Sequence, residues 1–346
     1  MEIFDDYLNK NKAFIVAELS ANHKGKLSIA LDSIEAAKEA GADAIKIQTY
    51  TPDSMTINIK KGEFLVKFGN NWDGLSLYDL YKEAYTPYEW HQRLFEKAKE
   101  SDITIFSTPF DIHAVDFLDN LNNPIYKISS FEITDIPLIK YAASKGKPII
   151  ISTGIATKND ITNAVNTCRS VGNNKIILLK TTSQYPAQID DANLNFIPYY
   201  SKKFKVVSGL SDHTLGLTVP MVARSLGALV IEKHFILNKK IKTPDSAFSI
   251  DIKEFRQMVN AVRDVEKSMG TTDFTLSDKT RVSRKYRRSL YVVEDVKKGE
   301  VFTDKNVKSI RPGLGMHPKH YENVLGKTAI KVVKKGTPLR KNLMNE

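Results

Sequence analysis

The sequence has little cysteine and no long apolar run. It has one cysteine among 346 residues, Cys168, so it can form no internal disulfide and is typical of a protein that folds in a reducing compartment. No apolar run approaches the ~20 residues that span a bilayer. The charged N-terminal stretch, residues 1–12, lacks the apolar core of a signal peptide. We therefore expect a cytoplasmic protein with no membrane partner.

A dinucleotide-binding fingerprint is also missing, because no G-x-G-x-x-G follows a predicted strand. The apolar fraction of 42% and the charged fraction of 26% are ordinary for a folded globular protein, which argues against extensive disorder. The length exceeds that of a usual single domain, so one large domain and one small domain are expected.

The net charge of +11 is unevenly distributed along the chain. Residues 281–346 contain 17 Lys and Arg against 6 Asp and Glu, whereas the first 280 residues contain 34 of each sign. A solvated face is one interpretation of this basic segment, and attraction of an anionic substrate or of nucleic acid is another. Nucleic acid is the weaker choice, because the segment lacks an aromatic stacking pattern and a zinc signature. We expect no nucleic-acid partner.

Short apolar runs alternate with amphipathic stretches over the first 270 residues. The runs are rich in Ile and Val and mostly lack polar alternation, as is typical of strands buried on both faces. The predicted strands are 13–18, 43–47, 103–107, 125–129, 148–152, 175–180, 205–209 and 228–233. The clearest predicted helices are 28–40, 88–101, 135–145, 157–171, 216–226 and 251–268. This alternation predicts the α/β class with a parallel sheet, and eight strands favour a closed (β/α)8 TIM barrel over an open doubly wound sheet.

The composition changes after residue 270. We predict a barrel domain over 1–270, a polar and basic linker over 271–286, and a small β-rich domain over 287–346. A module of about 60 residues is near the lower limit for independent folding, so it is expected to dock on a neighbour. The interruption at 50–87 is too long for a plain connection and is expected to be functional.

Polar residues follow the predicted strands, at the end of the barrel where active sites of this fold are built. Lys46, Lys127 and Lys180 are expected to point at one mouth without enough acid nearby in the sequence to neutralise them. Because buried charge is costly unless it is paired, an anionic ligand is predicted, and the neighbouring hydroxyl groups suit phosphate and carboxylate. Each strand-end Ser, Lys or His taken alone also has a structural explanation, as a helix cap, a snorkelling side chain or a core residue.

Two histidines follow the seventh and eighth predicted strands, His213 and His234. Neighbouring strands lie roughly 4.8 Å apart, so the two imidazoles can converge on one ion. Oxygen ligands from water, Glu18 and a substrate would complete a site that suits Mn2+ or a similar divalent metal. Zinc is disfavoured because a cysteine ligand set is missing.

Several strings of the sequence resemble the sialic acid synthase family. They are AELSANH (17–23), KIQTYTPDS (46–54), STPF (107–110), YKISSFE (126–132), ISTGIA (151–156), GLSDHT (209–214), IEKHF (231–235) and IRPG (310–313). Within the family they are most similar to the branch that makes pseudaminic acid. The resemblance covers almost the whole chain, and the basic C-terminal part is similar to the SAF, or antifreeze-like, domain.

The resemblance implies roles for the matching positions. His213 and His234 match a metal-binding pair, with Mn2+ the first choice and Mg2+ or Co2+ also possible. The positions that match phosphoenolpyruvate contacts are Lys46, Thr108, Lys127, Ser130, Ser152, Ser183 and Ser211. The positions that match contacts to the amino-sugar aldehyde are Gln48, Glu132, Tyr185, Asp245 and Arg311. Arg311 is implied to reach the partner's barrel in a homodimer with exchanged SAF domains. The implied catalytic residues are Glu18, Glu132 and Lys46, with Glu18 the first choice for proton transfer.

The implied reaction condenses phosphoenolpyruvate with 2,4-diacetamido-2,4,6-trideoxy-L-altrose and water to give pseudaminic acid and phosphate. Ile47, Ser183 and Thr243 stand where the N-acetylneuraminate branch has His, Asn and Gly, which agrees with a sugar that carries a methyl in place of a hydroxyl. Synthesis of N-acetylneuraminate or legionaminate stays open. A Schiff-base aldolase with Lys127 or Lys180 as nucleophile stays open too, as does a binding protein whose basic module contacts nucleic acid or ice.

Overall fold

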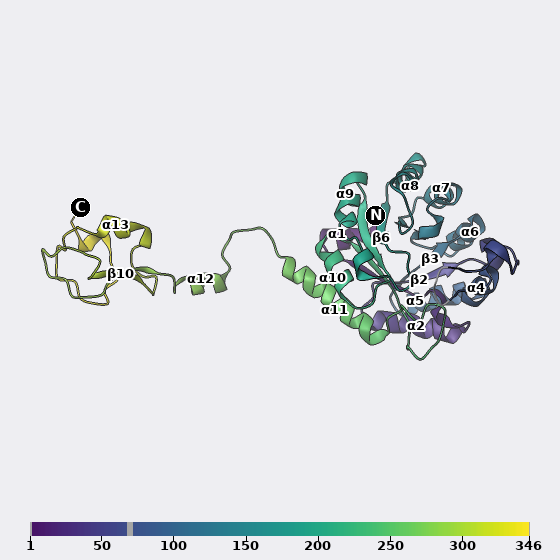
Figure 1. Cartoon of the computed structure of the whole chain (residues 1–346), viewed down its shortest axis with the longest axis horizontal. Coiled ribbons are helices and arrows are strands. Elements are labelled where there is room, and N and C mark those ends of the chain that lie inside the picture. Colours follow the sequence, from purple (N-terminus) through teal and green to yellow (C-terminus); the bar gives the residue numbers. More distant parts are fainter. Residues whose placement is uncertain (1, 68–71, 346) are drawn as a thin grey trace. The chain divides into compact units, whose positions relative to one another are not determined.

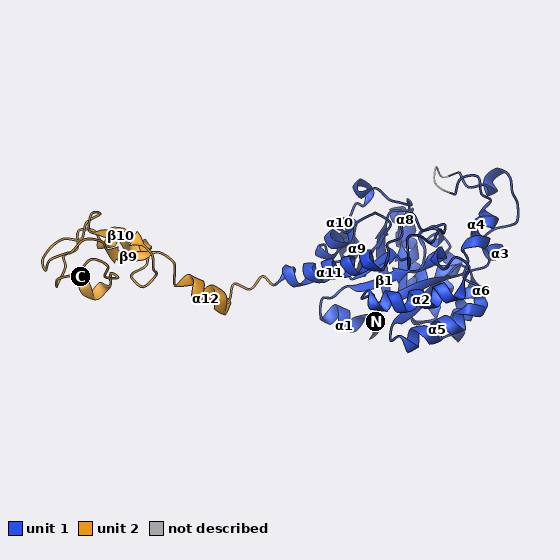
Figure 2. Ribbon diagram, turned by 90° about the horizontal axis from the view of Figure 1, so that it is seen from below, with its two compact units in different colours: residues 1–270 blue, residues 271–346 orange. Residues whose placement is uncertain are grey.

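The computed structural model describes residues 2–67 and 72–345, and the chain forms two compact units, Met1–Gly270 and Thr271–Glu346 (Figure 2). The first unit contains a closed barrel of parallel strands in the order β1 to β8, and β8 pairs with β1 to close it (Figure 1). The predicted (β/α)8 barrel is therefore confirmed. Among the described residues, no helix is both long and apolar enough to cross a membrane.

Each predicted strand overlaps one strand of the barrel. The strands are β1 (Phe14–Glu18), β2 (Ala44–Thr49), β3 (Thr104–Pro109), β4 (Tyr126–Ile128), β5 (Ile149–Ser152), β6 (Ile176–Thr181), β7 (Val207–Asp212) and β8 (Val230–His234). The long segment after β2 contains two short helices, α3 (Pro52–Met55) and α4 (Leu77–Ala84).

The predicted helices are present as well, and several shorter ones accompany them. The predicted ones are α2 (Leu27–Glu39), α5 (His91–Glu100), α7 (Ile136–Ser144), α8 (Lys158–Ser170), α10 (Thr218–Ser225) and α11 (Ile252–Met269). The pattern missed α1 (Glu2–Asn9), α6 (Ile112–Asn120) and α9 (Phe196–Phe204), which are about as long as the predicted α7 and α10, so length alone does not explain the misses. Helices α6, α7 and α8 lie side by side on the outside of the barrel (Figure 1).

The barrel interior is apolar at one end and charged at the other. Alternate residues of each strand point inward. Near the N-terminal ends of the strands, the inward residues form an apolar cluster that includes Phe14, Val16, Ala44, Phe106, Ile150, Ile177 and Val230. At the next inward positions, toward the C-terminal ends, stand Glu18, Lys46, Thr108, Lys127, Ser152, Ser211 and Glu232. The change from apolar to charged residues places a polar site at the C-terminal mouth.

Outward residues of the strands pack against the helices. Ile45 and Ile47 of β2 belong to a cluster with residues of α2, α5 and α11. Ile47 is fully buried in that cluster and faces away from the barrel interior. Its difference from the N-acetylneuraminate branch therefore does not act through contact with a ligand in the mouth.

Helix α1 closes the N-terminal end of the barrel. Phe4 is fully buried and its ring lies edge-on to Phe14, with 5.0 Å between the ring centroids. Tyr7 packs on the same ring at 5.0 Å, and its hydroxyl donates to Asp43 Oδ1 at 3.0 Å. Helix α1 thus covers the apolar end of the barrel, which is the end opposite the charged mouth.

The second unit is a small β-rich body with its own core. Strands β9 (Ser289–Val292) and β10 (Val307–Ile310) pair antiparallel, and isolated bridges join further extended segments. Its buried cluster includes Leu290, Val296, Phe302, Val324, Val333 and Leu339. The unit also contains α13 (Tyr321–Val324) and α12 (Asp278–Arg284), and α12 lies inside the segment predicted to be a linker.

We expect Phe4→Ala to lower the free energy of unfolding by about 3–5 kcal/mol, because the cavity would form at a site that cannot collapse. Since Phe4 packs at the end opposite the mouth, ligand binding by the folded fraction should not change. Leu8→Ala, on the same helix but 41% exposed, is the matched control and should cost less than about 0.5 kcal/mol. Urea denaturation measures both variants. Equal losses in the two would contradict this account of α1.

Candidate functional site

A cavity of about 950 Å³ opens at the C-terminal ends of the strands. The predicted site residues that line it are Glu18, Lys46, Gln48, Lys127, Ser130, Glu132, Ser152, Ser183, Tyr185, Ser211, His213, His234 and Asp245. Thr108 is buried behind the wall, and its hydroxyl lies 3.4 Å from Lys46 Nζ. Arg311 belongs to the second unit, where it is exposed directly after β10.

Two lysines and two glutamates form a buried charge cluster in this cavity, which we call the mouth cluster: Glu18, Lys46, Lys127 and Glu232. Lys46 Nζ lies 2.6 Å from Glu18 Oε2 and 3.7 Å from Glu232 Oε1. Lys127 Nζ lies 3.6 Å from Glu232 Oε1, and each of the four side chains is at most 5% exposed. The prediction that the lysines lack acidic partners was therefore wrong, because their partners come from β1 and β8, far away in the sequence.

Glu232 received no role from the sequence, although it stands at the centre of the mouth cluster. Its Oε1 also accepts a hydrogen bond from Ser211 Oγ at 2.9 Å. The signal that would have found it is the alternation along β8, because Val230 faces the interior and every second residue after it does the same.

Burial and ion pairing give the groups of the mouth cluster different pKa values. Burial raises the pKa of Glu18 to about 7, against the opposing effect of Lys46, and the charge of Glu232 adds to the rise. Burial also acts to raise the pKa of Glu232, but Lys127 and Lys46 hold it below its ordinary value. Burial lowers the pKa of Lys127 to about 8. Glu18 is therefore the carboxyl of the cluster that gains or loses a proton near neutral pH.

Lys180 does not point at the mouth, contrary to the prediction. Leu179 faces the barrel interior and Thr181 lines the cavity, so the alternation of β6 turns Lys180 to the outer face. Its Nζ donates to the Thr181 carbonyl at 2.7 Å. The sequence could not separate Lys180 from Lys127 because both stand near strand ends.

The two predicted metal ligands lie together, with 5.3 Å between the ring centroids of His213 and His234. His213 Nδ1 lies 2.8 Å from the Thr182 carbonyl, so this nitrogen carries the proton and Nε2 keeps a lone pair. Burial lowers the pKa of His213 to about 4. Burial, with repulsion from His213 and Lys46, also holds the pKa of His234 well below its ordinary value. Both imidazoles are therefore neutral, as a metal ligand must be.

The histidines offer two nitrogen ligands and little else from the protein. Over residues 2–67 and 72–345, no three His, Cys, Asp or Glu side chains are arranged to hold a metal ion. A carboxylate oxygen, Asp245 Oδ2, lies 3.6 Å from His234 Nδ1. This nitrogen has no hydrogen-bond partner within those ranges. The pair fits a divalent metal whose remaining ligands are water and substrate oxygens.

Buried polar atoms without a hydrogen-bond partner are concentrated in this cavity. Within the described ranges they are Glu18 Oε2, Glu132 Oε2, Ser152 Oγ, Ser183 Oγ, Glu232 Oε2 and His234 Nδ1, and all six residues line the cavity. Glu18 Oε2 makes the ion pair with Lys46 instead. An unsatisfied buried group costs about 1–3 kcal/mol, so such a concentration is expected where a ligand supplies the partners.

Gly154 allows two of the hydroxyl groups to approach the backbone closely. Its amide donates to Ser130 Oγ at 3.1 Å. A Cβ at this position would lie 2.0 Å from Ser183 Oγ and 2.9 Å from Ser130 Oγ. The glycine therefore lets both hydroxyl groups lie against its backbone, where a larger residue would displace them.

Aromatic and apolar side chains line the other walls of the cavity. The Tyr185 ring lies 4.4 Å from His213, and the Phe248 ring lies 4.8 Å from His234, both measured between centroids. The long segment after β2 contributes Tyr50, Met55, Trp72, Leu77, Leu80, Tyr81 and Ala84. The sequence assigned no role to Trp72 or Phe248, because an aromatic residue in a loop has no distinctive pattern.

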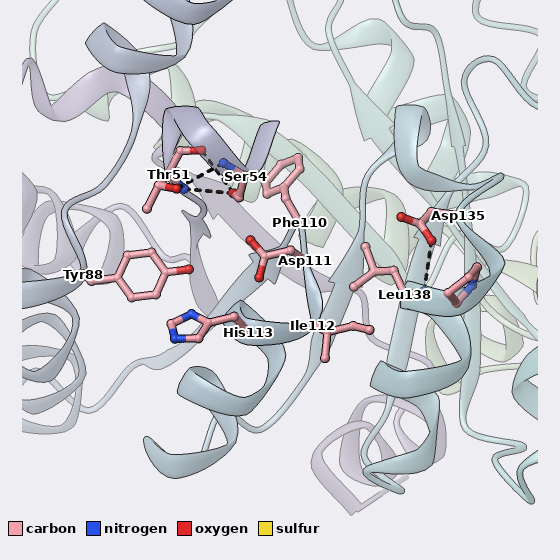
Figure 3. Close-up of a pocket in the computed structure, with 10 residues that line it drawn as sticks. Thr51, Ser54, Tyr88, Phe110, Asp111, Ile112, His113, Asp135 and Leu138 are labelled. Atoms are coloured by element: carbon pink, nitrogen blue, oxygen red, sulfur yellow. Dashed lines mark hydrogen bonds between the residues drawn. The ribbon is translucent and has the colours of Figure 1, made fainter. Parts of the chain in front are cut away.

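A second cavity of about 760 Å³ lies beside the loops that follow β3 and β4 (Figure 3). Two of its polar side chains cap helices: Asp111 accepts from the Ala114 amide at 2.7 Å, and Asp135 accepts from the Leu138 amide at 3.1 Å. None of the predicted site residues lines it. We therefore assign the candidate site to the cavity that holds the mouth cluster.

Comparison with known proteins agrees with the resemblance seen in the motifs. Residues 33–274 match the model of the NeuB family and residues 287–343 match the SAF domain. The chain is 49% identical over 326 residues to pseudaminic acid synthase of Helicobacter pylori, a match that covers 94% of this chain and 96% of that protein. It is 36% identical over 332 residues to N,N'-diacetyllegionaminic acid synthase of Legionella pneumophila, covering 94% of this chain and 93% of that protein. The solved structure of N-acetylneuraminic acid synthetase from Leptospira borgpetersenii matches with a TM-score of 0.70 and 31% identity, covering 79% of this chain and 90% of that one. The motifs, the barrel and these matches agree that the chain belongs to the NeuB family.

Proposed function

We propose that this protein is a pseudaminic acid synthase, which condenses phosphoenolpyruvate with 2,4-diacetamido-2,4,6-trideoxy-L-altrose and water and releases phosphate. The observation that carries the proposal is the 49% identity, over nearly the full length of both chains, to the Helicobacter pylori enzyme of that name. The legionaminic acid synthase of Legionella pneumophila is less similar at 36%.

Phosphoenolpyruvate would bind over the mouth cluster, with Lys46 and Lys127 facing its negative charges. The hydroxyls of Ser152 and Ser183, which have no hydrogen-bond partner among the described residues, support this placement. Ser130, Ser211 and Thr108 would complete the shell. Because both lysines already have carboxylate partners, a trianionic ligand would raise the proton affinity of those partners further. Glu18, whose pKa is already about 7, would then take up a proton as phosphoenolpyruvate binds.

A proton held on Glu18 would let this residue act first as a general acid and then as a general base. As C3 of phosphoenolpyruvate bonds to the aldehyde carbon, Glu18 would donate its proton to the aldehyde oxygen. As a carboxylate it would then accept a proton from the water that adds at C2, before the C2–O bond breaks and phosphate leaves. Glu132 is the second candidate, because burial raises its pKa to about 7 and its Oε2 has no hydrogen-bond partner among the described residues.

His213 and His234 would hold a divalent metal, with Mn2+ the first choice and Mg2+ or Co2+ also suitable. When bound there, the ion supplies a Lewis acid for the aldehyde oxygen. The neutral imidazoles and the Nδ1–H of His213 bonded to the Thr182 carbonyl support this assignment. Gln48, Tyr185 and Asp245 line the same cavity and would contact the sugar.

An apolar wall of the cavity favours a deoxy sugar with acetamido groups. The apolar wall consists of five side chains that line the cavity: Met55, Leu77, Leu80, Phe110 and Phe131. A methyl group gains contact there, whereas a hydroxyl would lose its hydrogen bonds to water without replacement. This supports the altrose derivative over N-acetylmannosamine.

We also propose a cytoplasmic homodimer with exchanged SAF domains, and exposed apolar side chains around the mouth support the dimer. The loops after β2 to β7 each carry one such side chain, 47–55% exposed: Ile57, Ile112, Phe131, Ile155, Ile189 and Leu215. Exposed apolar side chains that surround one opening are consistent with a protein interface there. The partner's SAF domain would cover it and bring its Arg311 to the sugar.

A Schiff-base aldolase is a second candidate, because burial lowers the pKa of Lys127 to about 8 and so frees more of its amine at neutral pH. Borohydride trapping with pyruvate separates the two functions. The proposed condensation predicts no adduct, whereas a covalent adduct on Lys127 would favour the aldolase.

The direct test offers each candidate aldehyde with phosphoenolpyruvate and Mn2+ and measures phosphate release. We expect the altrose derivative to exceed N-acetylmannosamine in kcat/KM by at least about tenfold, because the apolar wall favours a methyl over a hydroxyl group. We also expect it to exceed the legionaminate precursor, on the basis of the 49% against 36% identity to the two synthases. Exhaustive chelation should abolish turnover and added Mn2+ should restore it. Preference for another aldehyde would refute the substrate assignment, and turnover after chelation would refute the metal.

Lys46→Ala should raise the KM for phosphoenolpyruvate at least about tenfold, since it removes a charge-assisted contact and leaves buried carboxylates unpaired. Lys180→Ala is the matched control, because this lysine stands near a strand end but on the outer face. Steady-state kinetics should show a KM within about twofold of the parent for the control. Similar effects of both substitutions would contradict the role given to Lys46.

Glu132→Gln should become more stable relative to the parent as pH rises. The pKa of Glu132 is about 7 in the fold and lower when unfolded, so the unfolded chain loses its proton first and the parent loses stability between about pH 4.5 and 7. The amide never ionises and escapes that loss. Urea denaturation without metal or substrate, at pH 4.5, 6 and 8, measures the difference. A difference that does not change with pH would show that Glu132 ionises alike in both states.

A further inference from the structure

Each histidine of the pair follows one half of a buried ion pair. Asp212 precedes His213 on β7, Lys233 precedes His234 on β8, and Asp212 and Lys233 are partners in the strand register. Because side chains alternate, the histidines face the cavity while Asp212 and Lys233 face the outer side of the barrel. A contact on the outer side that fixes the backbone of these strand ends therefore also fixes the backbone that carries the histidines.

The contacts of this ion pair join the residues immediately before and after His213. Lys233 Nζ lies 2.5 Å from Asp212 Oδ2 and also donates to the Thr214 carbonyl. Asp212 Oδ1 accepts from both the amide and the hydroxyl of Thr214, at 2.9 and 2.8 Å. The residues on both sides of His213 are thus fixed to each other and to the residue before His234.

Stability alone gives no reason to keep such a pair. The side chains of Lys233 and Asp212 are 0% and 1% exposed, so both charges lose their hydration. Replacing a buried ion pair by neutral residues of similar volume is often neutral or stabilising. The hydrogen bonds of this pair are made to Thr214, and they restrict the backbone geometry of the segment around His213.

We propose that Asp212 and Lys233 are positioning residues that set the separation and orientation of the His213 and His234 imidazoles, and thereby the affinity for a divalent metal. The inference rests on the proposed metal site. The hydrogen bond from His213 Nδ1 to Thr182 fixes the ring, whereas the ion pair fixes the backbone that carries it. Supports of this kind around metal ligands typically change affinity 10–100-fold.

The test replaces the whole pair, Asp212→Asn with Lys233→Met, and measures binding of Mn2+ alone by the electron paramagnetic resonance signal of the free ion. We expect the Kd for Mn2+ to rise at least about tenfold while the unfolding midpoint changes by only a few degrees. The matched control removes the largely buried Arg224–Glu266 pair, with Arg224→Met and Glu266→Gln. It should change the unfolding midpoint by a similar few degrees and leave the Kd unchanged.

An unchanged Kd in Asp212→Asn/Lys233→Met, or an equal rise in the control, would overturn the inference while leaving the proposed function intact. Failure of the parent protein to bind Mn2+ would overturn both. If the double variant does not fold, Asp212→Glu retains both charges and lengthens the carboxylate by one methylene. A raised Kd with a parental midpoint in that variant supports positioning, and an unchanged Kd contradicts it.

Discussion

The mutual pairing of four buried charges at the barrel mouth is the constraint on which the site depends. Glu18, Lys46 and Glu232 come from three adjacent strands and Lys127 from β4, and none is more than 5% exposed. Removing one partner would leave the others charged and unpaired in a poorly hydrated environment. The pairing keeps the lysines in place. Under the proposed function, an anion binds by competing with these carboxylates for the same ammonium groups, and its binding is then linked to proton uptake.

The rest of the barrel supplies the surroundings that this cluster needs. Below it, the apolar interior and the ring of Phe4 exclude water from the N-terminal end. Beside it, the histidine pair is kept neutral by burial, and the outward ion pair of Asp212 and Lys233 joins the two strands that carry the histidines. Above it, the segment between β2 and α5 forms an apolar wall. Within the described ranges, the unsatisfied buried side-chain atoms lie where these parts meet at the cavity, which is where a ligand would complete them.

Much of the fold followed from local sequence, and the errors share one physical cause. Buried parallel strands have uniform Ile and Val composition, so the eight runs were visible, and most strand-end residues gathered in one cavity as predicted. Lys180 was misplaced and Glu232 overlooked because a strand-end residue can face either side, and only the phase of the alternation decides which. The lysines were thought unpaired because their partners stand on strands that become neighbours only when the barrel closes. Helix α6 was missed although its N-cap, Asp111, accepts a hydrogen bond from the Ala114 amide.

The number of protons taken up when phosphoenolpyruvate binds tests the account most directly. Titration calorimetry at pH 8 in buffers with different ionisation enthalpies gives this number for the Mn2+-loaded protein and for Glu18→Gln. The mouth cluster predicts that uptake falls by about one proton in the variant, because the ligand displaces Glu18 from Lys46 and Glu18 then takes up a proton from solvent. Lys127, whose pKa is about 8, contributes a part of a proton in both proteins. Binding without proton uptake, or with equal uptake in Glu18→Gln, would show that the anion does not bind over these four charges.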